Sequence, residues 1–285
     1  MKDLLEKMFK RNEGNTKKDL DFTKSSQCKT WFKRMVAFTL AEVLITLGII
    51  GVVAAITIPT LVKNYKKHVI ATRLKQNYNL LQNAYNMAIA EYGDPDNWDE
   101  LTVADSNPGR AIVEKYITPY LKLTQPLDKY TLQDLGYKTP IYERDGKTVR
   151  MALNSSSSKA VLANGSILYG LYGISKENSN NEYVYDGIRI HFDLNGASGP
   201  NTLGKDAFEY MLLLAKGARI SFGEKDFTFN PDTRELVFTG DDYRDDRDRQ
   251  KAINGCKDLN KLPVYCGLLI MQSGWKFPKD YPLSF

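Results

Sequence analysis

One apolar run dominates the pattern of hydrophobic and polar positions along the chain. Residues 38–62 (FTLAEVLITLGIIGVVAAITIPTLV) form 25 consecutive positions of membrane-spanning length, and Glu42 is the only charged residue among them. An ionised carboxylate inside a bilayer costs roughly 2.5–3.5 kcal/mol. We therefore expect Glu42 to have a partner or a function that an ordinary anchor does not need.

After Val62 the pattern becomes that of an amphipathic helix. Apolar side chains recur at steps of three and four residues, at Ile70, Leu74, Tyr78, Leu81, Tyr85, Ala88 and Tyr92. No break separates the two patterns, so we predict one helix from Phe38 to about Tyr92, on the order of 80 Å long. Pro59 is expected to kink this helix, because proline removes a backbone hydrogen bond. Gly93-Asp94-Pro95 is expected to end it.

The remainder of the chain predicts a mixed domain. Residues 111–123 indicate a short helix that breaks near Pro119. Strands are predicted at 160–163, 166–172, 183–192, 207–214, 218–222, 227–229 and 236–239. Asn164-Gly165, between the first two strands, is a strong hairpin signal. The predicted fold class is α+β, with the long N-terminal helix packed on a C-terminal antiparallel β-sheet.

Two polar stretches, Ser155–Ser158 and Asp241–Arg249, are expected to be exposed loops.

The net charge of the whole chain comes from its first 37 residues. They hold ten of the 39 Lys and Arg residues and five of the 34 Asp and Glu residues, which leaves 29 of each sign beyond them. A neutral remainder gives no reason to expect a nucleic-acid partner.

Near the apolar run the sequence resembles the type IV pilin superfamily, which includes the pseudopilins of type II secretion systems. The resemblance rests on the basic Lys33-Arg34, the block Phe38-Thr39-Leu40-Ala41-Glu42, Gly48 with Gly51, and Pro59. A looser likeness to pilin-like domains covers DLNGASGPNTLGKDAF (193–208) and GWKFPKDYP (274–282). The residue before the cut is usually Gly in that family, whereas here it is Ala37, which should slow processing.

The resemblance implies that a prepilin peptidase cuts between Ala37 and Phe38 and methylates the new N-terminal Phe38. The chain then divides into a basic leader (1–37), a transmembrane and assembly helix (38–62), its amphipathic continuation (63–92) and an extracytoplasmic globular domain (93–285). The new α-amino group, on the same subunit or a neighbour, would pair with Glu42. At about 4 Å and an effective dielectric near 20, such a pair gains roughly 4 kcal/mol.

The implied function is that of a structural subunit, a pilin or pseudopilin, without enzymatic activity. Its partners would be the prepilin peptidase, other pilin or pseudopilin subunits, an inner-membrane assembly platform and the membrane itself. It would reside in the bacterial inner membrane as a single-pass protein and then in a filament. Two alternatives are a monomeric domain that uses the helix as a tether, and a secreted enzyme behind a signal peptide.

Two cysteines, Cys256 and Cys266, remain beyond the leader, which carries Cys28. An even pair in an exported domain favours a disulfide over two free buried thiols. The two histidines, His68 and His191, are far apart in the sequence and lie in no recognisable catalytic motif. A solvated position and a strand position, respectively, are sufficient explanations for them.

Asp193, Asn195 and Asp206 gather oxygen ligands on a glycine-rich loop, which is the chemistry that Ca²⁺ prefers. The alternative is a turn in which Asn195-Gly196 supplies the positive φ and the Asp side chains cap backbone amides. The spacing does not match an EF-hand, so we favour the turn and expect no cofactor, with calcium as the remaining alternative.

Overall fold

The computed structural model of the protein describes residues 39–98, 108–177, 179–181, 183–214, 220–221, 228–230, 232–233, 235–237 and 246–285. The chain divides into two units, of which the first ends at Val53 and the second begins at Ala54. The predicted leader (1–37) and Phe38 lie outside the described residues.

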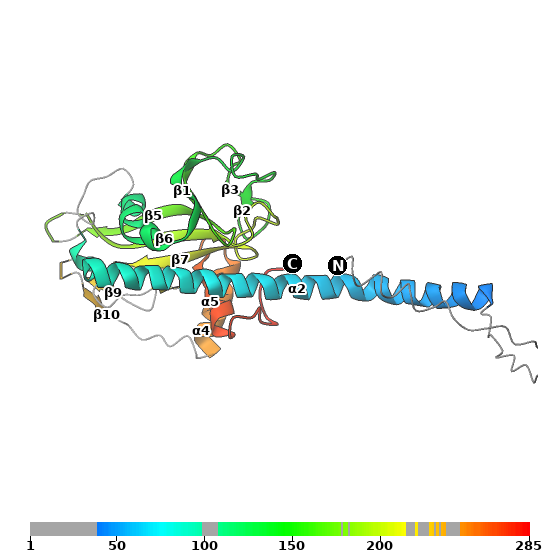
Figure 1. Cartoon of the computed structure of the whole chain (residues 1–285). Helices are drawn as coiled ribbons and strands as arrows, with labels where there is room; N and C mark the ends of the chain where they lie inside the picture. The colour runs from blue at the N-terminus through cyan, green and yellow to red at the C-terminus, as the bar shows by residue number, and fades with distance from the viewer. Residues whose placement is uncertain are drawn as a thin grey trace, which may run out of the picture. The chain divides into compact units, whose positions relative to one another are not determined.

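Helix α2 runs from Leu40 to Tyr92 and has Pro59 in its interior (Figure 1). Its second half buries one stripe: Ile70, Ala71, Leu74, Asn77, Leu81, Ala84, Tyr85 and Ala88. The predicted amphipathic helix is therefore confirmed, although Tyr92 is exposed and Tyr78 only partly buried. The helix ends as predicted, because Gly93 takes φ +81° and its N–H donates to the Ile89 carbonyl.

After a short turn (η1, Pro95–Asn97), the second helical region consists of α3 (Pro108–Ile112), a π-helical turn (η3, Val113–Ile117) and a 3-10 turn (η4, Thr118–Tyr120). The predicted short helix is present. It begins earlier than expected, and its end was predicted wrongly, because Leu123 already belongs to strand β1.

The main sheet is antiparallel, with the strand order β1-β4-β5-β6-β7-β8. Its strands are β1 (Leu123–Tyr130), β4 (Ser157–Leu162), β5 (Ile167–Glu177), β6 (Tyr183–Asp193), β7 (Ala207–Leu213) and β8 (Ile220–Ser221). Two small hairpins accompany it, β2 (Ile141–Tyr142) with β3 (Val149–Met151), and β9 (Thr228–Asn230) with β10 (Glu235–Val237). The strands predicted between 160 and 214 are confirmed, and so is the α+β class.

The hairpin between β4 and β5 turns at Gly165, whose φ is +81°. The Gly165 N–H donates to the Leu162 carbonyl, and the Leu162 N–H donates to the Ser166 carbonyl. The side chain of Asn164 also binds helix α2, because its Nδ2 donates to Oδ1 of Asn77 at 2.8 Å. This contact joins the hairpin to the helix and satisfies a buried polar side chain in the otherwise apolar stripe.

Both polar stretches that were expected to be exposed loops are partly regular structure. Ser157 and Ser158 belong to β4, and Ser158 is buried. Residues 246–249 begin helix α4 (Asp246–Lys257), and residues 241–245 lie outside the described part. Arg249 forms an ion pair with Asp280 at 2.7 Å, so the positive charge of Arg249 has a partner within the domain. A further helix, α5 (Val264–Gln272), was not predicted.

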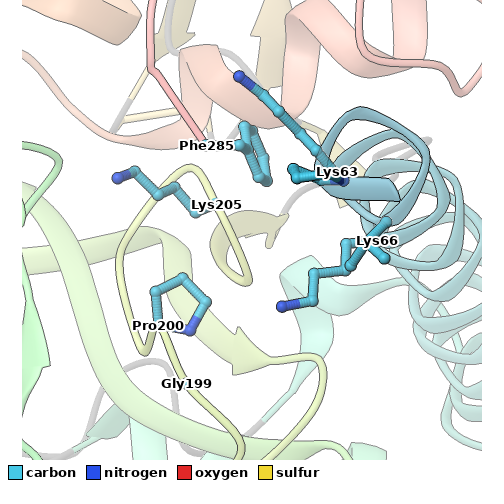
Figure 2. Close-up of a pocket in the computed structure, with 8 residues that line it drawn as sticks. Lys63, Lys66, Gly199, Pro200, Lys205 and Phe285 are labelled. Carbon is cyan, nitrogen blue, oxygen red and sulfur yellow. The ribbon is translucent and has the colours of Figure 1, made fainter. Parts of the chain in front are cut away.

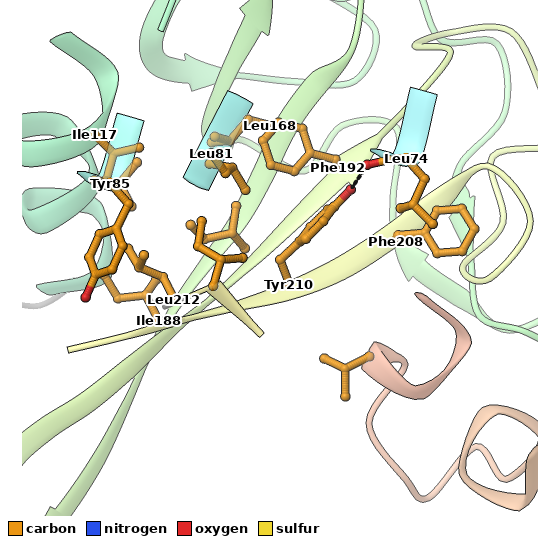
Figure 3. Close-up of a cluster of buried hydrophobic side chains, with 14 of the residues drawn as sticks. Leu74, Leu81, Tyr85, Ile117, Leu168, Ile188, Phe192, Phe208, Tyr210 and Leu212 are labelled. Carbon is orange, nitrogen blue, oxygen red and sulfur yellow. Dashed lines mark hydrogen bonds between the residues drawn. The ribbon is translucent and has the colours of Figure 1, made fainter. Parts of the chain in front are cut away.

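The core lies between α2 and one face of the sheet, and α5 joins the same cluster. Figure 3 shows Leu74, Leu81 and Tyr85 of α2 with residues from alternate positions of β6 and β7, including Ile188, Phe192, Tyr210 and Leu212. Two hydroxyls tie the layers together, as Tyr210 donates to the Leu74 carbonyl (3.1 Å) and Tyr85 to the Leu213 carbonyl (2.6 Å).

The opposite face of the sheet is covered by a smaller cluster that includes Leu132, Tyr137, Ile141 and Met151. Because both faces are covered, all seven residues of β7 are buried. Such a strand has no face toward water, so its one charged residue, Glu209, is buried as well and lies against His191.

Candidate membrane and assembly site

The first half of α2 exposes almost all of its large apolar side chains. The exposed residues between 40 and 62 are Leu40, Val43, Leu44, Ile45, Leu47, Ile49, Ile50, Val52, Val53, Ile56, Ile58, Leu61 and Val62. In the described part of the chain, α2 is long and apolar enough to cross a membrane, and its apolar stretch is not buried by the rest of the protein. An apolar surface this large marks a membrane or protein contact.

Glu42 lies in the first turn of this helix, where Thr39 binds it. Glu42 Oε2 accepts hydrogen bonds from the Thr39 N–H and the Thr39 hydroxyl, both at 2.8 Å. In return, the Glu42 N–H donates to Thr39 Oγ1 at 3.2 Å. Thr39-Leu40-Ala41-Glu42 is therefore a capping box, which pairs N–H groups that a helix start otherwise leaves free. This motif was not predicted, although its Thr-x-x-Glu spacing is visible in the sequence.

The second oxygen of Glu42 is not used in this way. No hydrogen bond to Oε1 is found among the described residues, while Oε2 takes both bonds from Thr39. A carboxylate has acceptor capacity on both oxygens. Glu42 can thus cap its own helix and still accept a proton donor from outside it. Ala37 and Phe38, the predicted cleavage residues, lie outside the described part, so the pairing of Glu42 with a new amine stays a prediction.

The two glycines of the apolar segment, Gly48 and Gly51, have open space beside them among the described residues. A Cβ atom added to Gly48 or Gly51 would meet no atom within 4 Å. The predicted kink at Pro59 is not tested by these observations, since the helix is assigned without interruption through this residue.

His191 is a buried structural residue in β6. Its Nε2 lies 2.8 Å from Oε2 of Glu209 on β7, and neither side chain is exposed. The two residues face each other directly in the strand register. Gly170 packs against the imidazole so closely that a Cβ there would lie 2.6 Å from His191 Nδ1. A pair enclosed in this way has no access to a substrate, which agrees with the strand explanation for His191.

The aspartates of the glycine-rich loop bind groups of the protein itself. Asp193 accepts from the Tyr137 hydroxyl (2.8 Å) and the Asn195 N–H (3.2 Å). Asp206 accepts from the N–H groups of Asn201 (2.8 Å) and Thr202 (2.7 Å). Burial, and then repulsion by Asp206, raise the pKa of Asp193 well above its usual range. Burial also raises the pKa of Asp206, against the lowering effect of the amides it binds.

These contacts are those expected for a turn in which the Asp side chains cap backbone amides. Gly196 supplies the positive φ of that turn, at +60°. Asn195 donates its N–H and its side-chain Nδ2 within the same loop, and its Oδ1 is buried with no hydrogen-bond partner among the described residues. Among the described residues, no group of three or more His, Cys, Asp or Glu side chains is placed to hold a metal ion.

Cys256 of α4 and Cys266 of α5 form a disulfide. The prediction from their even number is confirmed. Both residues are buried, and the Arg144 guanidinium next to them donates to the Gly255 carbonyl (2.8 Å) and the Lys261 carbonyl (2.6 Å). The bridge and Arg144 together fix the connection between two helices that local sequence preferences alone do not specify.

The fold and this site define an α+β protein with an exposed, membrane-length apolar helix. A family model described as a family of unknown function (DUF6613) matches residues 60–285. The match covers most of the chain, and the protein belongs to this family. No curated protein and no solved structure matches the chain.

Proposed function

We propose that this protein is a structural subunit, a pilin or pseudopilin, of a type IV pilus or type II secretion filament. The observation that carries the proposal is the first half of α2, which exposes apolar side chains on all sides and holds one carboxylate in its first turn. The same helix continues into the core of an α+β domain. A helix of this kind can anchor the subunit in a membrane first and pack against other subunits later.

In this proposal, Glu42 determines how neighbouring subunits align along the filament. An ionised carboxylate in lipid is costly, and two hydrogen bonds from one threonine bring no positive charge to it. The N-terminal amine of a neighbouring subunit would bring a positive charge to Oε1, for which no donor is found among the described residues. Such a pair forms only when the helices are aligned, so it selects one stagger between subunits.

The processing and location follow from the same proposal. Prepilin peptidase removes residues 1–37 and methylates Phe38, and the inner-membrane assembly platform then adds the subunit to the filament. The role is structural rather than catalytic, and the domain beyond the membrane helix is extracytoplasmic.

A second candidate is a monomeric domain tethered by the helix. The capping box favours it, because Thr39 gives Glu42 a role within its own chain. A helix cap typically contributes only about 1 kcal/mol, which is less than the cost of the charge in lipid. We therefore rank the filament subunit first.

Replacement of Ala37 by Arg should block processing, because a long cation cannot occupy the place of the small residue before the cut. In cells with a prepilin peptidase, the parent protein should be shortened by 37 residues, as seen by gel mobility and by the intact mass. Ala37→Gly is the matched control and should be processed at least as fast as the parent. Cleavage that persists without the peptidase, or that falls at another bond, would contradict the proposed processing.

A further inference from the structure

The surface directly beyond the apolar segment carries a cavity with a basic rim. The cavity holds about 520 Å³ and lies between α2 and the loop around Pro200, with Pro59, Val62 and Phe285 in its wall. Figure 2 shows Lys63 and Lys66 on the helix, Lys205 on the loop, and Phe285 between them in this view. The wall is mainly apolar, so the lysine stems line it while their ammonium groups can reach water.

A second, smaller cavity of about 190 Å³ lies beside the next turn of the same helix. Lys67 and His68 line it together with Trp275, Lys276 and Phe277 from the C-terminal segment. Lys67 connects the two cavities, because its Nζ lies 4.9 Å from the centre of the Phe285 ring and 5.9 Å from that of Phe277. We call the following residues the juxtamembrane collar: Lys63, Lys66, Lys67, Lys205, Lys276, Phe277 and Phe285.

Among the described residues, no counterion for the lysines of the collar is found. The described residues that line the two cavities include no Asp or Glu. In the described parts of the chain, no ion pair is found for Lys63, Lys66 or Lys205. Burial, and then the charge of Lys63, lower the pKa of Lys67, as expected where cations gather without a counterion.

We propose that the juxtamembrane collar binds the phosphate-bearing headgroup of an anionic phospholipid. The occupant must be anionic to match the lysines and must carry apolar groups to fill the wall formed by Pro59, Val62 and Phe285. Both requirements are met by a lipid at the membrane surface. The collar begins at the last residues of the apolar segment, which is the depth at which headgroups and aromatic side chains meet.

The inference requires only that the apolar segment enters a membrane. It therefore holds for a filament subunit and for a tethered monomer alike, and it can fail independently of either. Its consequence is a second attachment that fixes the globular domain against the bilayer surface, in addition to the helix.

The test measures lipid retention by the full-length protein in a neutral detergent. Native mass spectrometry counts bound phosphatidylglycerol, and phosphatidylcholine with the same acyl chains serves as the neutral comparison. The variant is Lys63→Gln/Lys66→Gln/Lys205→Gln, which keeps long polar side chains and removes three charges. The control, Lys122→Gln/Lys129→Gln/Lys147→Gln, removes three exposed charges elsewhere in the described domain.

Phosphatidylglycerol should be retained more strongly than phosphatidylcholine, and the collar variant should bind it roughly 100-fold more weakly than the parent. The control variant should bind within about twofold of the parent, as its lysines do not line either cavity. Equal losses in the two variants would show non-specific attraction and overturn the proposal. Displacement of the lipid by millimolar inorganic phosphate would assign the site to a soluble anion and overturn it as well.

Discussion

Replacement of Glu42 by Val should nearly abolish incorporation of the protein into filaments and leave its membrane insertion intact or improved. Removal of the charge makes the helix easier to insert by a few kcal/mol. In the filament, however, the neighbour's amine would be left unpaired in a low-dielectric core. Loss of this pair should lower incorporation by about two to three orders of magnitude. The measurement compares the protein in sheared, pelleted filaments with the protein in the membrane fraction.

Two further variants separate charge pairing from helix capping at the same site. Glu42→Gln keeps an acceptor for the Thr39 capping box and removes the charge, so it should fail as Val does. Thr39→Val removes the hydroxyl from the box and keeps the charge, so it should cost about 1 kcal/mol and reduce assembly only mildly. Normal assembly of Glu42→Gln, together with failure of Thr39→Val, would mean that Glu42 is a helix cap alone.

Replacement of Leu74 by Ala should destabilise the globular domain by about 2–5 kcal/mol, because Leu74 is fully buried where α2 packs on the sheet. Leu80→Ala is the matched control, since it is the same change on the same helix at a position that is 40 % exposed. It should cost less than about 1 kcal/mol. Thermal melting of the full-length protein in detergent, followed by circular dichroism, gives both values. Equal destabilisation by the two changes would contradict the role of this helix stripe in the core.

The elements that could be predicted from the sequence are those whose own pattern determines them. The buried stripe of α2 recurs every three or four residues, so the spacing alone places Leu74, Leu81 and Tyr85 on one face. The turn at Gly165 is local as well, because the residue must adopt a positive φ. Asn77 breaks the apolar stripe, and only the folded structure shows why: it binds Asn164 and Ser166 from the hairpin.

Other elements depend on partners that are distant in the sequence. Strand β1 has an irregular register around Gln125 and contains Pro126, and it lies at the edge of the sheet. A proline is tolerated there because an edge strand need not donate on both sides, but the usual strand pattern is lost. Helix α4 is rich in charged residues, and its place is fixed by the disulfide from Cys256 and by burial of Ala252.

In the candidate site, too, some features follow from the local sequence and others depend on residues that are distant in the sequence. The exposed apolar helix and Glu42 were evident from the sequence, and the Thr39 cap could have been found from its spacing. The juxtamembrane collar could not, because Lys63 and Lys66 join Lys205 and Phe285 only after the loop and the C-terminal segment have folded beside α2. A run of lysines after an apolar segment indicates a membrane surface, whereas a cavity requires the tertiary structure.

The central claim is that the chain is processed as a filament subunit, and the mass of its mature N-terminal peptide tests this most directly. The protein is isolated from the membranes of cells that contain a prepilin peptidase, and the N-terminal peptide is sequenced by mass spectrometry. The proposed function predicts a peptide that begins at Phe38 and carries one added methyl group on its α-amino nitrogen. A protein that keeps Met1, or that begins at any other residue without this methyl group, would contradict the account.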